Sequence, residues 1–307
     1  MKKLFTRLVG FGLFTVIVWL GIFAICSMSY RFEYKLIGQE RNWGYVNLRS
    51  SEWAAKADHT EDVLFFGSST CYSGIDPAAL EAFGLSGFNF CSSSQTIGNS
   101  AALTDAVLSD VQPAFIALDV YPSIWGSENP GLESSKDWII NSNLRESHWS
   151  GAYRAAAFQT GDLFTMVSSI YYDLVRPWKP AGTNKLLAED KNGIYSGLGF
   201  VQRTYPPLDS IECPIAQRTM SAFECNAIFS VNETCRARGV QFILINPPQL
   251  CEESFDIPAC FESIPLIEGN NWPGAKTPQN FYDDHHLVAS GAAKYSVWLA
   301  NEIATLN

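Results

Sequence analysis

A long apolar segment stands at the start of the chain. Residues 8–30 contain no charged side chain, and Lys2, Lys3 and Arg7 directly precede them. As an α-helix, these 23 residues extend about 34 Å, which is enough to cross a bilayer core of about 30 Å. No second segment combines such length with such apolar character. The pattern therefore predicts a single membrane-spanning helix.

A cleaved signal peptide is the alternative for this segment. The apolar stretch of a signal peptide normally runs only about 7–15 residues and ends at a small-residue cleavage site. Here the stretch is longer, and FAICSMSY at its end offers no clear A-x-A site, so an uncleaved signal anchor is favoured. Positively charged flanks stay in the cytoplasm. We therefore expect a cytoplasmic stub at 1–7, a helical stalk at 31–60 and an extracytoplasmic domain at 61–307.

Short apolar runs alternate with helical patterns along this domain. Each run ends in small or polar residues, as buried parallel strands do where they feed loops, at 62–67, 87–91, 114–120 and 240–245. Helices are expected to start at Asp76-Pro77, to cover 96–108, to cover 218–238 before a Gly239 cap, and to close the chain through Trp298. This alternation predicts an α/β fold, a three-layer α/β/α sandwich with a central parallel sheet.

The segment 122–213 is too long for an ordinary crossover, and we interpret it as an insertion. It is rich in aromatic residues, and one helical stripe is legible at Leu163, Val167, Ile170, Tyr171 and Leu174. Packing of the insertion onto the sheet accounts for such aromatics. The functional alternative is that some of them line a cleft for an acyl chain or a sugar.

Composition and charge exclude several classes of protein. With 47% hydrophobic and 13% aromatic residues, the chain is not disordered. Its net charge of −10 argues against nucleic acid as a partner, because phosphate binding needs a basic face. Without Lys2, Lys3 and Arg7, the rest of the chain has 18 basic and 31 acidic residues and a net charge of −13. Because such a domain repels anions, neutral esters or sugars are favoured as substrates. Neither a P-loop nor a G-x-G-x-x-G motif is present, and no cofactor is expected.

The eight cysteines fit an oxidising compartment. Cys26 lies in the apolar segment, and no C-x-x-C pair occurs among the other seven, so disulfides are expected instead of a zinc or redox site. Cys251 and Cys260 bracket one loop and are the best candidate pair. Because seven is odd, at least one thiol is left over.

Two polar turns carry candidate chemistry. Ser69 lies in the loop after the first predicted strand, where a serine is either a helix cap or a nucleophile. Near the C-terminus, Asp283 precedes His286 by three residues, a spacing that lets the carboxylate fix the imidazole tautomer. A solvated polar turn is one alternative for this segment, and a metal site that also uses Asp284 and His285 is another.

Four sequence blocks resemble the SGNH, or GDSL-like, hydrolase superfamily, most closely its membrane-anchored bacterial envelope members. The blocks are DVLFFGSSTCYSGIDP, FNFCSSSQT, FIALDVYP and FYDDHHLVASGAAKYS. The resemblance implies a flavodoxin-like sheet. It places the nucleophile at Ser69, in a Gly67-Ser68-Ser69 turn, and the Asp-x-x-His motif at Asp283 and His286, with His285 as the competing base.

The resemblance also implies an oxyanion hole. Ser94 stands where the family has a glycine whose N–H contributes to that hole, and Gly67 belongs to the nucleophile turn. The family's Gly-x-Asn-Asp block is absent, and Asp119-Val-Tyr121-Pro122 occupies that strand end, so Tyr121 is the candidate replacement donor.

The function expected from these features is that of a serine esterase or O-acyltransferase. It would act on acyl esters of envelope polysaccharide, lipid or small molecules, on the periplasmic side of a bacterial inner membrane. The alternative is a binding or assembly component that keeps the fold without activity, which the missing block favours.

The membrane topology gives the first testable prediction. A periplasm-active alkaline phosphatase reporter fused after Asn307 should be active. The cationic N-terminus is expected to stay in the cytoplasm, which places the C-terminus on the opposite side of the membrane. A cytoplasm-active reporter at the same position serves as the control. Activity of the control alone would show that the orientation is reversed.

Overall fold

The computed structural model describes residues 2–27, 45–128, 138, 166, 192–213, 217–251 and 254–306. Within these residues, a five-stranded sheet forms the centre of the domain, in the order β2-β1-β3-β7-β9. The strands are β1 (Val63–Phe66), β2 (Gly87–Asn89), β3 (Phe115–Asp119), β7 (Gln241–Asn246) and β9 (Leu266–Glu268). All four neighbouring pairs are parallel. The prediction of an α/β fold with a central parallel sheet is confirmed.

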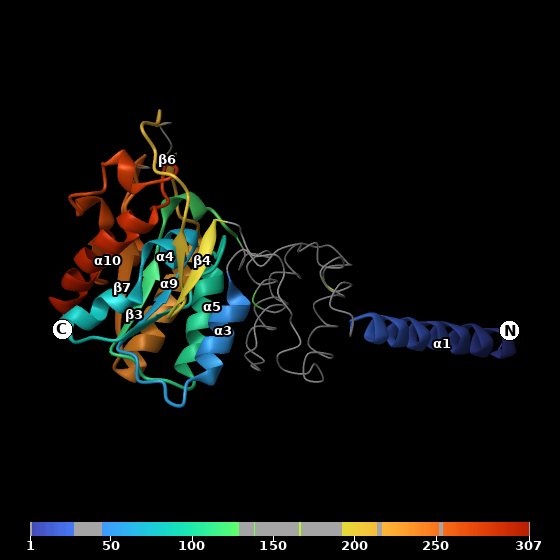
Figure 1. Ribbon diagram of the computed structural model, residues 1–307. Coiled ribbons are helices and arrows are strands. Elements are labelled where there is room, and N and C mark those ends of the chain that lie inside the picture. Colours follow the sequence, from blue (N-terminus) through green and yellow to red (C-terminus); the bar gives the residue numbers. More distant parts are fainter. Residues whose placement is uncertain are drawn as a thin grey trace.

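Helices cover both faces of the sheet (Figure 1). On one face, α5 (Ile97–Leu108) packs against α9 (Ala222–Arg238). On the other face, α10 (Ala289–Ala304) packs against α4 (Ser69–Gly74) and the 3₁₀ helix η1 (Pro77–Phe83). Side chains alternate along the strands: Leu64 and Phe66 join the first cluster, whereas Val63 and Phe65 join the second. Two hydrophobic cores therefore hold the three layers together.

The helix boundaries follow from identifiable caps. Asp76 accepts a hydrogen bond from the Ala78 N–H at 3.0 Å and starts η1, which is 3₁₀ where an α-helix was expected. Thr96 caps α5 in the same way. The helix expected over 218–238 starts later, at Ala222, because Ser221 and Glu224 form a capping box, and Gly239 ends it as expected. Strand β9 was not predicted, since three residues give no usable pattern.

The predicted stalk is wrong for residues 45–60. Helix α3 (Val46–Ala55) packs into the domain, with Val46 fully buried and Trp53 at 6% exposure. The Trp53 ring lies 4.9 Å from Phe88 and 4.7 Å from Phe90, centroid to centroid. The mixed polar and apolar composition of α3 reflects a helix with only one buried side. The domain boundary therefore lies before residue 45, and residues 28–44 are outside the described part.

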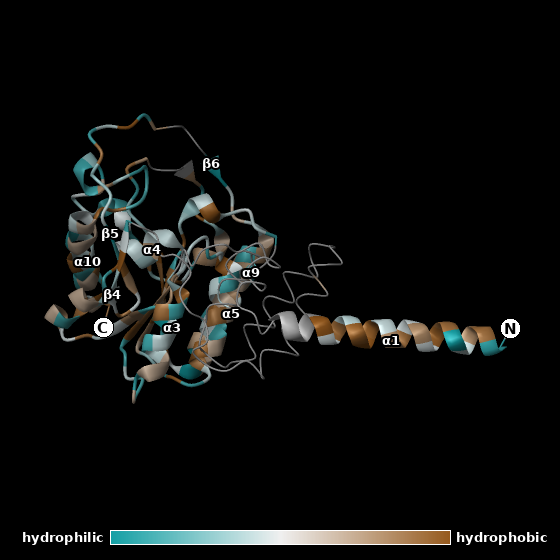
Figure 2. Ribbon diagram, turned by 45° about the vertical axis from the view of Figure 1, so that its right-hand side comes forward, coloured by the Kyte–Doolittle hydropathy of each residue, from teal (hydrophilic) through white to brown (hydrophobic). Residues whose placement is uncertain are grey.

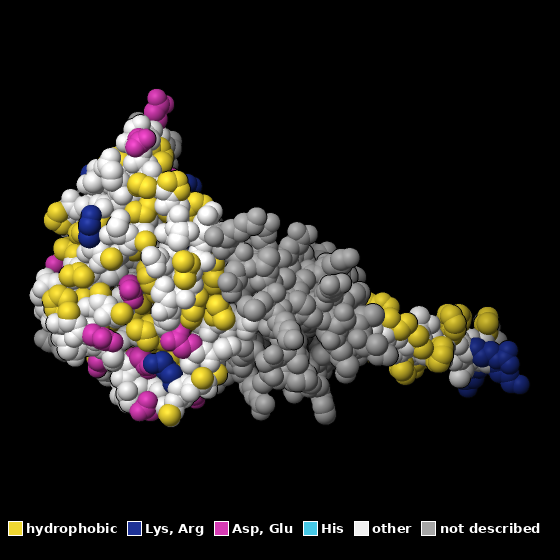
Figure 3. All heavy atoms as spheres, viewed as in Figure 1, with side chains coloured by type: hydrophobic (Ala, Val, Ile, Leu, Met, Phe, Trp, Pro, Cys, Tyr) yellow, Lys and Arg dark blue, Asp and Glu magenta, His cyan; other side chains and the backbone are white. Residues whose placement is uncertain are grey.

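Helix α1 (Lys2–Ser27) is long and apolar enough to cross a membrane, and none of that apolar span is buried in the protein. In the ribbon of Figure 2 most residues of α1 have hydrophobic colours, and Figure 3 shows Lys and Arg side chains gathered at its N-terminal end. A signal sequence has the same properties, so the structure supports an anchor or a signal.

Of the predicted insertion, the described part contains an antiparallel hairpin of β4 (Gly193–Gly197) and β5 (Phe200–Arg203), and β5 contacts α4. A short parallel pair joins β6 (Gln217–Arg218) to β8 (Ser254–Phe255). Trp138 is fully buried and donates a hydrogen bond to Gln95 at 2.8 Å. The helix expected around residues 163–174 falls outside the described residues.

The predicted disulfide between Cys251 and Cys260 is wrong. Cys251 pairs with Cys213, Cys260 pairs with Cys225, and Cys71 pairs with Cys91. Cys235 is a free, buried thiol. Closeness in sequence misled the prediction, because Cys225 lies on α9 and the fold brings that helix against the Cys260 segment. Three disulfides fit an oxidising compartment.

The burial of α3 gives the second prediction. Trp53→Ala should lower the free energy of unfolding by about 3–5 kcal/mol, because it leaves a cavity among aromatic rings. Val297→Ala, at a position 51% exposed, is the control and should change it by less than about 0.5 kcal/mol. The measurement is urea unfolding of the full chain in detergent. Equal, small effects would indicate that α3 is not part of the core.

Candidate active site

The nucleophile candidate lies at the carboxyl edge of the sheet. Strand β1 is fully buried and ends at Phe66, and Ser69 is the first residue of α4. Between them, Gly67 has φ of +151°, and a Cβ there would lie 2.4 Å from the Asp119 Cβ. Only glycine fits this approach of two neighbouring strand ends. In this strand order the chain turns to opposite sides after β1 and β3, which is where ligands bind in open α/β sheets.

A buried carboxyl group holds this edge together. Asp119, at the end of β3, accepts a hydrogen bond from the Thr70 hydroxyl at 2.5 Å and one from the Tyr121 N–H at 2.8 Å. Thr70 also shares a hydrogen bond of 2.8 Å with the Ser68 hydroxyl. Complete burial raises the pKa of Asp119 to about 7, although both hydrogen bonds act in the opposite direction. Asp119 thus connects the Ser69 turn to the Tyr121 strand end.

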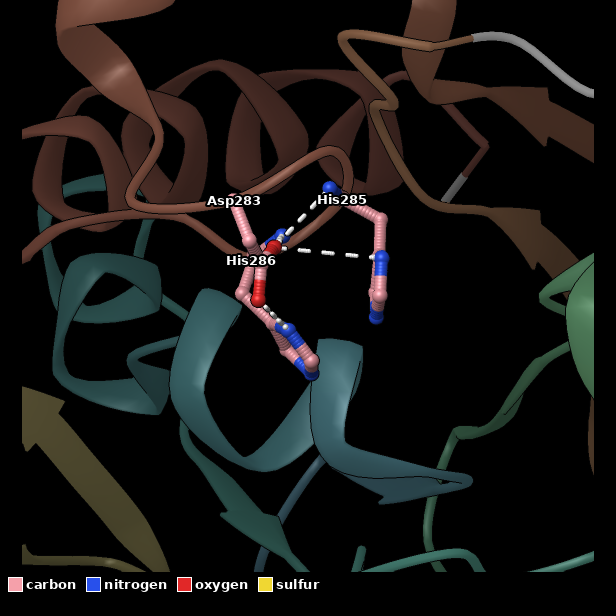
Figure 4. A group of neighbouring side chains, drawn as sticks. All are labelled: Asp283, His285 and His286. Atoms are coloured by element: carbon pink, nitrogen blue, oxygen red, sulfur yellow. Dashed lines mark hydrogen bonds and ion pairs between the residues drawn. The ribbon is translucent and has the colours of Figure 1, made fainter. Parts of the chain in front are cut away.

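The C-terminal motif forms a tight turn. Phe281 and Leu287, both buried, form an antiparallel bridge that closes it. Inside the turn, one oxygen of Asp283 accepts the backbone N–H groups of His285 at 3.0 Å and His286 at 2.7 Å. The other oxygen lies 2.7 Å from His286 Nδ1 (Figure 4). Asp283 therefore shapes the turn and orients the imidazole at once.

The turn meets α4 across 217 positions of sequence. His286 Nε2 lies 2.8 Å from Ser69 Oγ, and Asp283 lies behind Nδ1. The structure thus brings the Ser69 hydroxyl, the His286 imidazole and the Asp283 carboxylate into one hydrogen-bonded series, the arrangement of a Ser-His-Asp triad. His285, the competing candidate for the base, makes no hydrogen bond with Ser69 within the described residues.

The electrostatics of the turn suit proton transfer. Burial by itself raises the pKa of Asp283, but the hydrogen bond from His286 and the charges of both imidazoles lower it to about 2. Burial lowers the pKa of His286 below 6.5, and the hydrogen bond to Asp283 only partly opposes this. At neutral pH, a charged carboxylate therefore orients a neutral imidazole that can accept a proton.

A solvent-accessible pocket of about 420 Å³ opens at Ser69. Its lining includes the predicted residues Ser69, Ser94, Tyr121, His285 and His286. The lining residues that were not predicted as site residues are Tyr72, Ser93, Ser123, Ile124, Arg203, Tyr205 and Tyr282. Of these, Tyr282 is adjacent to Asp283 and could have been noticed, whereas Arg203 and Tyr205 lie in the insertion without any motif.

The oxyanion candidates differ in their positions. Ser69 is the first residue of α4, so its N–H has no partner within the helix, and Ser94 has a left-handed φ of 51° in the pocket wall. Glycine adopts a left-handed φ of this kind more readily than other residues do. Gly67 is not among the lining residues of the pocket. The close approach of its backbone to Asp119 is the reason for a glycine at this position. The Tyr121 N–H donates to Asp119, and Tyr121 is one of the lining residues of the pocket.

The metal alternative fits the turn poorly. Asp283, His285 and His286 place potential ligand atoms within 4.8 Å of one another. However, the Nδ1 atoms of both histidines already lie at hydrogen-bond distance from carboxylates, at 2.6 and 2.7 Å. No fourth His, Cys, Asp or Glu joins this group in the part of the chain that is described. The donor atoms are therefore arranged for hydrogen bonding among themselves.

No protein-family model matches the chain, and no curated protein matches it. The geometry of the site therefore carries the functional argument.

The pKa of His286 gives the third prediction. In NMR spectra of the full chain in detergent micelles, the His286 ring should titrate below pH 6.5, because burial disfavours its charged form. Asp283→Asn should lower this pKa further, since the carboxylate favours the imidazolium. The His286 signal is assigned by its loss in His286→Ala. A titration above pH 6.5 would contradict the described environment.

Proposed function

We propose that the protein is a membrane-anchored serine esterase or O-acyltransferase of the SGNH type. The observation that carries the proposal is the hydrogen-bonded series Ser69, His286 and Asp283, with spacings of 2.8 and 2.7 Å, whose first two members line a pocket. Two further observations support it: the sheet order matches the flavodoxin-like order, and the series lies at the topological switch point.

The proposed reaction proceeds through an acyl-enzyme. Ser69 Oγ attacks the ester carbonyl carbon while His286 Nε2 accepts its proton and Asp283 stabilises the imidazolium. His286 then returns the proton to the leaving alcohol as its C–O bond breaks. Water or a hydroxyl group next attacks the acyl carbon, gives its proton to His286, and Ser69 recovers that proton as it leaves.

The oxyanion of each tetrahedral intermediate needs hydrogen-bond donors. The backbone N–H groups of Ser69 and Ser94 and the Tyr121 side chain are the proposed donors, and the first two come from α4 and the loop after β2. Each well-placed donor contributes about 3 kcal/mol to the transition state. The disulfide between Cys71 and Cys91 supports this role, because it joins α4 to the loop that carries Ser94.

The location we propose is the periplasmic side of a bacterial inner membrane. The apolar α1 with its cationic start favours a cytoplasmic N-terminus, and the three disulfides favour an oxidising compartment for the domain. Acyl esters of envelope polysaccharide, of lipid or of small molecules are the substrates available there.

The fourth prediction tests the nucleophile. A fluorescent fluorophosphonate should label the full chain in detergent, and Ser69→Ala or His286→Ala should reduce labelling and p-nitrophenyl acetate hydrolysis by at least about 10³-fold. Ser290→Ala, at an exposed position on α10, is the matched serine control. If the wild type takes no label while a control esterase does, the protein is a binding component with this fold.

A further inference from the structure

A second imidazole–carboxylate pair lies beside the first. His285 Nδ1 is 2.6 Å from Asp284 Oδ1, just as His286 Nδ1 is 2.7 Å from Asp283. The two imidazole centroids are 3.9 Å apart, with 43° between the ring planes. Both rings leave the turn on the same side (Figure 4), and both line the pocket. The reaction proposed above uses only one of the two.

His285 is held as firmly as its neighbour. Its ring stacks on Tyr121 with the centroids 4.9 Å apart and 21° between the planes. Its backbone N–H donates to Asp283, and the carbonyl of Asp284 accepts the Cys251 N–H at 3.1 Å. The Cys213–Cys251 disulfide anchors that contact. With Asp284 at Nδ1 and Tyr121 against its face, the ring is preorganised for a contact in the pocket.

The partner of Nδ1 decides what the other ring nitrogen can do. A carboxylate opposite Nδ1 favours a proton there, which leaves Nε2 of the neutral imidazole as a hydrogen-bond acceptor. For His286 this acceptor faces Ser69 Oγ. For His285 no hydrogen bond of Nε2 occurs within the described residues, and its ring lines the pocket. Two acceptor nitrogens are thus available on adjacent rings.

We infer that His285 recognises a second hydroxyl group of the substrate alcohol. While His286 serves the oxygen that carries the acyl group, His285 Nε2 accepts a hydrogen bond from the hydroxyl on the neighbouring carbon. The alcohol half of the ester is then a vicinal diol, the arrangement found around a sugar ring. Serine and tyrosine hydroxyls elsewhere in the pocket wall suit the same polar ligand. This inference rests on the proposed function and narrows its substrate class.

The experiment compares two esters that differ in one hydroxyl. The kcat/KM values for alcohol release are measured for the monoacetate of cis-cyclohexane-1,2-diol and for cyclohexyl acetate, with the full chain in detergent. Because kcat/KM reports acylation, the comparison holds for a hydrolase and for a transferase. The wild type should prefer the diol ester by about tenfold, as expected for one additional hydrogen bond.

Two substitutions separate hydrogen bonding from packing. His285→Phe keeps a ring against Tyr121 without an acceptor, and its preference should fall to about one. His285→Gln loses the ring but keeps an acceptor oxygen, and it should retain part of the preference. A purely structural role predicts the opposite order. Because each result is a ratio within one variant, a general loss of activity cancels. Val297→Ala, at an exposed position of α10, is the control for unrelated change.

The outcomes distinguish the two proposals. A wild type that releases alcohol from neither ester nor from p-nitrophenyl acetate overturns the proposed function, and the role of His285 with it. Turnover without a preference for the diol ester overturns the role of His285 alone. The same holds if His285→Phe keeps the full preference.

Discussion

The carboxylate of Asp283 is the interaction on which the site depends. One oxygen accepts hydrogen bonds from two consecutive backbone N–H groups, which bends residues 283–286 into a turn. The other oxygen lies at hydrogen-bond distance from Nδ1 of the His286 imidazole. A single charged group therefore fixes the backbone of the turn and the tautomer and direction of the His286 imidazole. The neighbouring His285 is placed by the same bend, because its N–H is one of the two that Asp283 holds. The Phe281–Leu287 bridge closes the turn from the buried side.

The other half of the site depends on how closely two strand ends approach. Gly67 leaves the space that the Asp119 side chain fills, and Asp119 in turn binds Thr70 and the Tyr121 backbone. The start of α4 and the end of β3 are consequently linked into one unit. The Cys71–Cys91 disulfide adds the loop after β2 to that unit. The ends of β1, β2 and β3 are thereby linked to one another beside the C-terminal turn, an arrangement that favours a preorganised site.

Much of this arrangement could be predicted from local patterns, and the exceptions have physical reasons. The strands around residues 63–66 and 115–119 and the caps at Thr96 and Gly239 depend on neighbouring residues, so the sequence alone predicts them. The spacing of Asp283 and His286 likewise predicts their contact. Disulfide partners depend on tertiary packing, which is why Cys251 was paired wrongly. The buried side of α3 was missed because its amphipathic pattern is weak, and Arg203 reaches the pocket only through a hairpin without a motif.

The charge of the whole chain and the charge of the pocket lead to compatible conclusions by different routes. The acidic excess of the residues after the N-terminal segment repels polyanions. Ions in solution screen this repulsion at separations beyond about 10 Å. The described lining residues of the pocket include no carboxylate. Arg203 is the permanently charged side chain among these residues. Asp283 and Asp284 direct their negative charge into the two imidazoles instead of the pocket. If the function proposed above is correct, the acidic exterior disfavours polyanionic substrates, and the hydroxyl and imidazole groups of the pocket wall suit an uncharged ester that carries hydroxyls, such as a neutral sugar ester.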